Sequence, residues 1–206
     1  MYTLLLDSSN KLLVVGLAKD NKVIDSIIYE AWQKQSEYMI NEINNIFTRN
    51  NIDPKEVNEI IVTKGPGSYT GLRIALTIAK IYGYILNISI YALSSLEILI
   101  DSKDKDTNTI CLMNARSSRS YIGIYSSNKE VLLEDKVLTN EEVKTLIKNN
   151  PTYKVSGDIS YLNLDLDNTN YYDLSNLDLL NNMLYLKDES NKVENILTLK
   201  AIYLKD

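Results

Sequence analysis

The run Lys64–Ala75, which reads KGPGSYTGLRIA, decides the fold of the first half of this chain. The 206 residues include only seven glycines, and Gly65, Gly67 and Gly71 are three of them. The run follows a short apolar stretch, typical of a strand, and precedes a helical pattern over 72–86. This order predicts free backbone N–H groups in one concavity, which suits an anion or a close-packed partner. A tight strand-to-helix turn is the simpler alternative.

Two common phosphate-binding signatures do not fit this run. No Gly-Lys-Ser/Thr follows the glycines at the spacing of a Walker loop. The dinucleotide fingerprint requires a third glycine at position 70, where this chain has Thr70. The glycines alone therefore do not identify a ligand.

Composition limits the class of protein. The chain is 45% hydrophobic, which is enough for a core, and its net charge of −5 disfavours general nucleic-acid binding through a basic surface. No apolar run is long enough to cross a membrane, and residues 1–30 resemble strands and not a signal peptide. The single cysteine, Cys111, lies in an apolar run that predicts a buried structural thiol. These features together predict a cytoplasmic protein.

The chain contains no histidine. This excludes Ser-His-Asp and Cys-His catalysis, acid–base chemistry by imidazole, and metal sites that use histidine. One cysteine is too few for a thiolate zinc site, so only a carboxylate-bound hard cation such as magnesium stays open. We therefore expect no catalytic residue, no resident metal and no cofactor.

The first hundred residues predict a mixed sheet with helices packed on it. Apolar runs separated by polar turns predict an antiparallel meander, and amphipathic periodicity predicts a helix whose stripe at Met39, Ile40, Ile43, Ile46 and Phe47 indicates core packing. Ser94 and Glu97 have the spacing of a capping box and predict a third helix. The expected strands are 2–7, 12–17, 22–29, 59–62 and 88–91, and the first two helices are 36–49 and 72–86.

The polar stretch 102–108 predicts a domain boundary, with one domain over 1–101 and a smaller, divergent one over 102–206. The order of elements then repeats in shorter form. Thr139 and Glu142 predict a capped helix that reaches about residue 149. The expected strands are 109–113, 120–126, 130–137 and 153–156, and a last helix is expected near 175–186.

The helical pattern over 72–86 is apolar on nearly every face. Such a helix is either enclosed on all sides or covered by a partner. Because a sheet covers only one side of a helix in a small domain, we interpret the pattern as a protein–protein contact. Enclosure by neighbouring helices is the alternative.

The glycine run also resembles a family signature. Residues 65–74, GPGSYTGLRI, are similar to the signature of the bacterial TsaB proteins. The resemblance continues at Asp7-Ser8-Ser9, at Gln35-Ser36, at Asn114-Ala115-Arg116 and over 201–205. It is strong over 1–100 and thin after residue 125.

The resemblance implies a fold of two related α/β domains of the actin-like, or ribonuclease H-like, kind. It further implies a non-catalytic partner of TsaD, the subunit that transfers the threonylcarbamoyl group to transfer RNA beside the anticodon. The ATPase TsaE would join this pair, and transfer RNA would be bound only through the complex. The family's older link to glycoprotease peptidases has no support in the residues here.

Several positions depart from the family pattern. Gln35 stands in place of the usual His, Asn114 in place of Asp, and Arg119 in place of a frequent Glu. Ile159 follows Gly157-Asp158 where nucleotide-binding relatives have a second glycine. A β-branched residue suits neither positive φ nor close approach to phosphate, so tight ATP binding is disfavoured.

Our leading hypothesis is a scaffold subunit whose helices at 36–49 and 70–86 contact TsaD, with self-association into a dimer when TsaD is absent. Arg73, in the first turn of its helix, is unfavourably placed against the helix dipole and is expected to pair with a partner carboxylate or with a carbonyl of its own domain. The expected contact residues are Tyr69, Thr70, Leu72, Arg73, Leu76, Lys80, Met39 and Ile43.

The alternative hypothesis is a small actin-fold ATPase or kinase. Asp7 would position magnesium and Gly65–Gly71 would hold phosphate, although an Asp that caps the following turn explains the same residue. In the scaffold reading this site is a vestige, made of Asp7, Ser8, Gly65, Gly67, Gly71 and Gly157.

Overall fold

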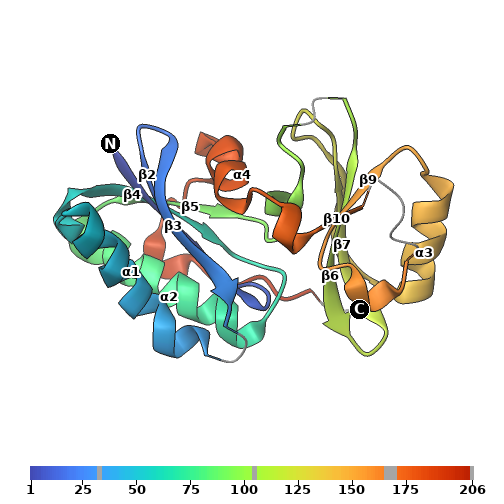
Figure 1. Ribbon diagram of the computed structural model, residues 1–206, viewed down its shortest axis with the longest axis horizontal. Helices are drawn as coiled ribbons and strands as arrows, with labels where there is room; N and C mark the ends of the chain where they lie inside the picture. The colour runs from blue at the N-terminus through green and yellow to red at the C-terminus, as the bar shows by residue number, and fades with distance from the viewer. Residues whose placement is uncertain (32–33, 104–105, 165–170, 205–206) are drawn as a thin grey trace. The chain divides into compact units, whose positions relative to one another are not determined.

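The computed structural model describes residues 1–31, 34–103, 106–164 and 171–204, and these form two compact units (Figure 1). Unit 1 contains residues 1–95 and 183–202. Unit 2 contains residues from 96 to 182 and those from 203 onward. This partition differs from the expected division at 101/102, chiefly because residues 183–202 pack with the first hundred residues.

Unit 1 is built on a five-stranded mixed sheet with the order β3-β2-β1-β4-β5. The first three strands are an antiparallel meander, as the sequence predicts, while β4 is parallel to both β1 and β5. The strands are β1 (Tyr2–Asp7), β2 (Leu12–Lys19), β3 (Lys22–Glu30), β4 (Val57–Thr63) and β5 (Ser89–Leu93).

Helices α1 (Gln35–Asn50) and α2 (Tyr69–Leu86) lie side by side along one face of this sheet (Figure 1). The side chain of Ser68 caps α2 by accepting a hydrogen bond from the Gly71 N–H at 3.2 Å. Both helices end at an asparagine in the left-handed conformation, a residue that tolerates positive φ. The expected stripe at Met39, Ile43, Ile46 and Phe47 is buried in the core of unit 1, and Ile40 is exposed.

Unit 2 is built on a second five-stranded mixed sheet with the order β10-β9-β6-β7-β8. The side chain of Thr139 accepts from the Glu142 N–H, and the Glu142 carboxylate accepts from the Thr139 N–H, which confirms the predicted capping box of α3. The elements are β6 (Thr109–Arg116), β7 (Arg119–Tyr125), β8 (Val131–Thr139), α3 (Asn140–Asn149), β9 (Lys154–Gly157) and β10 (Tyr171–Asp173).

The helix predicted from Ser94 and Glu97 is wrong, because the structure has only a 3-10 turn at Glu97–Leu99. The Ser95 N–H donates to the Gly65 carbonyl at 2.9 Å and holds the chain on the glycine run, so residue 94 does not start a helix. The apolar residues that follow are buried without a polar face, which an amphipathic surface helix would need. These residues are Leu96, Ile98, Leu99 and Ile100.

The last predicted helix is shorter than expected. It consists of α4 (Leu179–Leu186), preceded by a 3-10 turn at Leu174–Asn176. Within the described part of the chain, no helix combines the length and apolar content needed to cross a bilayer.

Candidate functional site

The glycine run passes so close to other backbone segments that side chains cannot fit. A Cβ built on Gly71 would lie 1.9 Å from the carbonyl oxygen of Ser8, and one on Gly67 would lie 2.2 Å from that of Ser9. A Cβ on Gly65 would lie 2.4 Å from the carbonyl oxygen of Ile202. The glycines are therefore required for close packing against the chain itself.

Hydrogen bonds fix this packing. The Ser68 N–H donates to the Ser9 carbonyl at 2.6 Å, and the Ser8 hydroxyl donates to the Gly71 carbonyl at 2.7 Å. The turn between β1 and β2 thus occupies the concavity in which the sequence placed an anion or a partner. The structure favours the close-packing interpretation, and the packed segment belongs to the same chain.

Asp7 lies at the end of β1 and is fully buried. Its Oδ1 accepts hydrogen bonds from the Thr63 hydroxyl at 2.5 Å and from the Ser9 N–H at 2.9 Å. Its Oδ2 makes no hydrogen bond to any residue that the structure describes. Burial raises the pKa of this carboxyl group above its usual value, although the Thr63 and Ser9 hydrogen bonds act in the opposite direction. The bond to Ser9 is that of an Asp capping its own turn.

The arrangement of these residues gives little support to a magnesium–nucleotide site. The turn that would face the phosphates is filled by Ser8 and Ser9, and Asp7 supplies a single buried carboxylate. In the described ranges no group of three or more acidic, cysteine or histidine residues could hold a metal ion. Gly157, the remaining residue of the expected vestigial site, lies in unit 2, where its Cβ would meet the Leu112 carbonyl at 2.1 Å.

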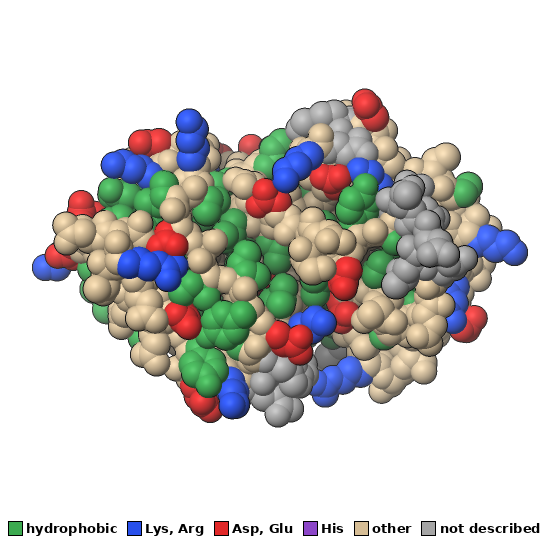
Figure 2. All heavy atoms as spheres, in the orientation of Figure 1, with side chains coloured by type: hydrophobic (Ala, Val, Ile, Leu, Met, Phe, Trp, Pro, Cys, Tyr) green, Lys and Arg blue, Asp and Glu red, His purple; other side chains and the backbone are tan. Residues whose placement is uncertain are grey.

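The outer side of α2 carries the exposed apolar residues that its sequence predicts. Figure 2 shows that hydrophobic side chains gather over unit 1 on the face in view. Tyr84 and Ile85 are 72% and 71% exposed, and Ile81 is 51% exposed. Their spacing of three and four residues puts them on one face of the helix. We call the exposed residues of this helix the α2 face: Tyr69, Thr70, Arg73, Thr77, Ile81, Tyr84 and Ile85.

The eight expected contact residues differ in exposure. Tyr69, Thr70 and Arg73 belong to the α2 face, where the Arg73 guanidinium lies 3.8 Å from the centre of the Tyr69 ring. Lys80, on the same helix, is half-buried. The other four are buried in the core of unit 1 and are left out of the surface proposed below: Met39, Ile43, Leu72 and Leu76. Their apolar periodicity is the same for a core and for an interface, so the sequence did not separate the two.

The sequence analysis did not predict Ile81, Tyr84 and Ile85 as individual contact residues. A signal was present, because these positions share a helical face with Arg73 and Thr77, whose polar side chains favour solvent. Apolar residues on the polar face of a helix are the informative ones, since core packing does not explain them.

Two residues of unit 2 that the sequence analysis singled out, Asn114 and Cys111, have structural roles. Asn114 lies at the end of β6, and its Oδ1 accepts from the Arg116 N–H at 2.8 Å, which caps the turn to β7. Cys111 is fully buried, and burial raises the pKa of its thiol well above the usual value. The predicted structural thiol is thus confirmed.

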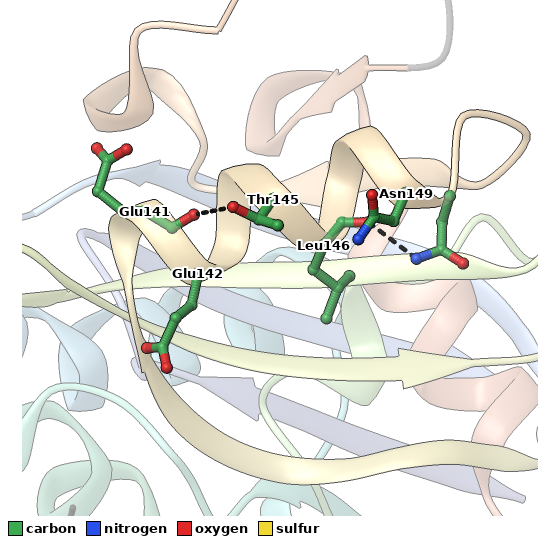
Figure 3. A pocket seen from close by; sticks show the side chains of 6 residues that line it. Glu141, Glu142, Thr145, Leu146 and Asn149 are labelled. Atoms are coloured by element: carbon green, nitrogen blue, oxygen red, sulfur yellow. Dashed lines mark hydrogen bonds between the residues drawn. The ribbon is translucent and has the colours of Figure 1, made fainter.

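A shallow hollow of about 450 Å³ lies along α3 (Figure 3). Its lining comes from one helix and the residue after it, and the side chains of Glu141 and Glu142 point to opposite sides. The Thr145 hydroxyl and the Asn150 amide are already bonded to helix carbonyls. The hollow therefore lacks converging polar groups of the kind that hold a ligand.

Residues 27–175 match the family model described as TsaD, tRNA N6-adenosine threonylcarbamoyltransferase. A protein of Bacillus subtilis named tRNA threonylcarbamoyladenosine biosynthesis protein TsaB is 34% identical over 138 residues, which is 66% of this chain. The chain belongs to this family, as a TsaB-type member. The match spans 60% of the length of the Bacillus subtilis protein.

Other comparisons cover more of the TsaB-type chain. A Mycoplasma genitalium protein, MG208, described as uncharacterized, is 29% identical over 100% of this chain and 95% of its own length. The solved structure of YeaZ from Pseudomonas aeruginosa has a TM-score of 0.80 and 21% identity over 98% of this chain and 99% of that one. The two mixed sheets with their helices thus form the expected fold of two actin-like, ribonuclease H-like halves.

Proposed function

We propose that this chain is a non-catalytic scaffold subunit in the biosynthesis of threonylcarbamoyladenosine in transfer RNA, and that it binds TsaD through the α2 face. The name of the Bacillus relative supports the pathway. The observation that carries the binding role is the exposure of Ile81, Tyr84 and Ile85 on one side of a helix whose other side is core. Large exposed apolar side chains grouped in this way are typical of protein interaction sites.

The glycine run supports the non-catalytic part of the proposal. Gly67, Gly71 and the Ser68 N–H pack on the chain's own β1–β2 turn, and the chain has no histidine to move a proton near neutral pH. The unpaired Oδ2 of Asp7 is the one feature that favours the ATPase alternative. Calorimetric titration with ATP and Mg²⁺ tests that alternative, and saturable binding with turnover by the isolated chain would support it.

The proposal extends to the assembly. TsaE joins the TsaD pair, transfer RNA is bound only through the complex, and the isolated chain forms a homodimer through the same α2 face in the cytoplasm. The net charge of −5 is consistent with this, because a chain that is acidic overall gains little from phosphate contacts by itself.

A paired set of variants tests the α2 face. Tyr84→Ser with Ile85→Ser removes the two most exposed apolar side chains of α2. Loss of two central contacts is expected to weaken TsaD binding by about thirtyfold or more, measured by titration calorimetry with purified TsaD. The matched control is Ile24→Ser with Ile28→Ser, which removes two exposed apolar side chains from β3 and is expected to leave affinity unchanged.

Circular dichroism and thermal unfolding establish that both double variants are folded. Undiminished TsaD binding by a folded Tyr84→Ser, Ile85→Ser variant contradicts the proposed surface. Equal loss in the β3 control would show that general surface hydrophobicity, and not the α2 face, supports binding.

A further inference from the structure

The strap, which we define as residues 192–202, is fastened to unit 1 at both ends. At one end, Lys192 forms an antiparallel bridge with Tyr91 of β5, and the Val193 N–H donates to the Ile90 carbonyl at 2.8 Å. At the other end, the Ile202 N–H donates to the Lys64 carbonyl at 2.7 Å. The strap therefore runs from the edge of the sheet to the glycine run.

Between these ends the strap lies against α2. The Lys80 ammonium donates to the carbonyls of Leu197 and Leu199, each at 3.2 Å. A Cβ on Gly83 would lie 2.6 Å from Ile90 Cδ1 of β5 and 3.1 Å from Ile196 Cδ1, so the absence of a side chain at 83 makes room for both β5 and the strap. Ile196 and Leu199 pack against the core of unit 1.

Leu197 differs from Ile196 and Leu199 of the strap in the exposure of its side chain. Its side chain is 69% exposed. Its backbone is nevertheless fixed on both sides, because its N–H donates to Asn195 Oδ1 at 3.0 Å and its carbonyl accepts from Lys80. An apolar side chain held outward on a fixed backbone loses little freedom when it is buried by a partner.

Lys80 places this leucine beside the α2 face. Lys80 directly precedes Ile81 and lies one helical turn before Tyr84. The Leu197 carbonyl, which accepts a hydrogen bond from Lys80, therefore adjoins the apolar part of the α2 face. Helix α2 carries two cationic residues, Arg73 and Lys80, and no acidic residue, although the chain as a whole has a net charge of −5. Because Lys80 is engaged by the strap, Arg73 is the residue of this helix that gives the apolar surface a cationic border, which is complementary to an apolar surface with an acidic border.

We propose that Leu197 is an anchor of the TsaD-binding surface, that Lys80 positions it by holding the strap on α2, and that the bound surface of TsaD is apolar with acidic residues at its border. This inference rests on the function proposed above. It makes the docking surface a composite of a helix and a distant segment of the chain, with Lys80 acting through the strap and not through direct contact.

A double-mutant cycle tests the inference with purified TsaD. Leu197→Ser is expected to weaken binding about tenfold, because an exposed side chain that is buried in the complex is lost. Lys80→Met is expected to weaken binding about threefold alone and to have almost no effect in the Leu197→Ser background, since a positioning residue has nothing left to position. Leu132→Ser, at an exposed leucine of β8, is the matched control and should bind as the unaltered chain does.

Hydrogen exchange supplies a readout other than affinity. Lys80→Met should speed amide exchange at residues 196–199 in the free chain, whereas Leu197→Ser should leave that exchange unchanged. Lys80→Arg keeps a donor and is expected to restore most of the affinity lost in Lys80→Met.

Failure of this inference is distinguishable from failure of the proposed function. Wild-type binding by Leu197→Ser, together with lost binding by Tyr84→Ser, Ile85→Ser, overturns the anchor and leaves the scaffold role in place. Wild-type binding by all of these variants overturns both. If the losses of binding free energy caused by Lys80→Met and Leu197→Ser simply add in the double variant, the positioning role of Lys80 is overturned. Weakened homodimerisation with unchanged TsaD affinity in Leu197→Ser makes a second copy the occupant and also overturns the proposal.

Discussion

The sheets of the two units have the same strand order, β3-β2-β1-β4-β5 in unit 1 and β8-β7-β6-β9-β10 in unit 2. They differ in how the last parallel pair is joined. In unit 1 the 18-residue helix α2 connects β4 to β5, whereas the described residues between β9 and β10 contain only a 3-10 turn at Ser160–Leu162. Because the same strand order forms with a 3-10 turn in the described part of this connection, α2 provides more than the sheet requires, and its exposed face is the part left to explain.

The turns at the strand ends show what the two units share. Gly67 in unit 1 and Gly157 in unit 2 both have positive φ, and a Cβ would meet the backbone carbonyl of Ser9, in the turn after β1, or of Leu112, within β6. Asp7 and Asn114 each cap the following turn in the same way: the Oδ1 atom accepts a hydrogen bond from the N–H of the residue two positions later. One oxygen acceptor is enough for each cap, so neither a charge nor a bound phosphate is required for it.

The largest expected effect comes from adding a methyl group at one closely packed glycine of each unit. Gly71→Ala in unit 1 and Gly157→Ala in unit 2 each place a methyl group about 2 Å from a carbonyl oxygen, at 1.9 Å and 2.1 Å. Each is expected to lower the free energy of unfolding by about 3 kcal/mol, measured by urea unfolding. For Gly71 this loss has the opposite sign to the gain of about 1 kcal/mol that alanine normally brings to a helix.

Gly83→Ala is the matched control on the same helix. There the Cβ would meet the ends of the Ile90 and Ile196 side chains, which can move, so the cost should stay within about 1 kcal/mol. A stabilising Gly71→Ala would mean that the β1–β2 turn does not pack on the glycine run, and the likeness between the two units would be lost.

A smaller effect is expected from exchanging the two turn-capping residues. The raised pKa of Asp7 means that the folded state keeps this proton at a pH where the unfolded chain has lost it. The contribution of Asp7 to stability is therefore present below the pKa of the unfolded chain and is lost as the pH rises through the folded pKa. Asp7→Asn is expected to remove this loss and to raise the free energy of unfolding by about 1 kcal/mol at pH 8.

Urea unfolding of both chains at pH 5 and pH 8 measures the difference. Asn114→Asp makes the reverse exchange at an exposed position of unit 2 and should show no such dependence on pH. A destabilised Asp7→Asn chain at pH 8 would indicate that the charge of Asp7 has a role that Asn114 lacks.

The smallest effect concerns Cys111, which lies in unit 2 and has no thiol counterpart in unit 1. Because its thiol is fully buried and its pKa is raised, iodoacetamide at pH 8 should leave it unmodified while the chain is folded. Mass spectrometry with and without urea measures the reaction. Rapid alkylation of the folded chain would show that the core of unit 2 opens far more readily than its burial implies.

Much of the fold could be predicted from local patterns. The meander of unit 1, both of its helices and the capping box at Thr139 follow from periodicity and from short-range hydrogen-bonding residues. Ser94 was misleading because a capping motif describes only the first turn of a helix. The structure instead binds Ser95 to the glycine run, a contact between residues 30 positions apart that no local pattern contains.

The candidate site was predictable only in part. The sequence pointed to α2 through its apolar composition, but Leu72 and Leu76 turned out to be core, and the contacts of Lys80 lie 117 and 119 residues further along the chain. The strap reads KVENILTLKAI, in which apolar and polar residues follow no clear period, so its path across α2 depends on long-range contacts. Likewise, the glycines indicated a crowded backbone without revealing that Ser8 and Ser9 are what crowds it.

The bridge between Lys192 and Tyr91 has a consequence for how these molecules meet one another. A bare outer strand offers its amide and carbonyl groups to any similar strand, and this is the usual beginning of open-ended, fibre-like growth. Here the polypeptide folds back and occupies part of the β5 rim with its own backbone. Edge-to-edge pairing of sheets through that part of the rim is therefore blocked by the chain's own backbone.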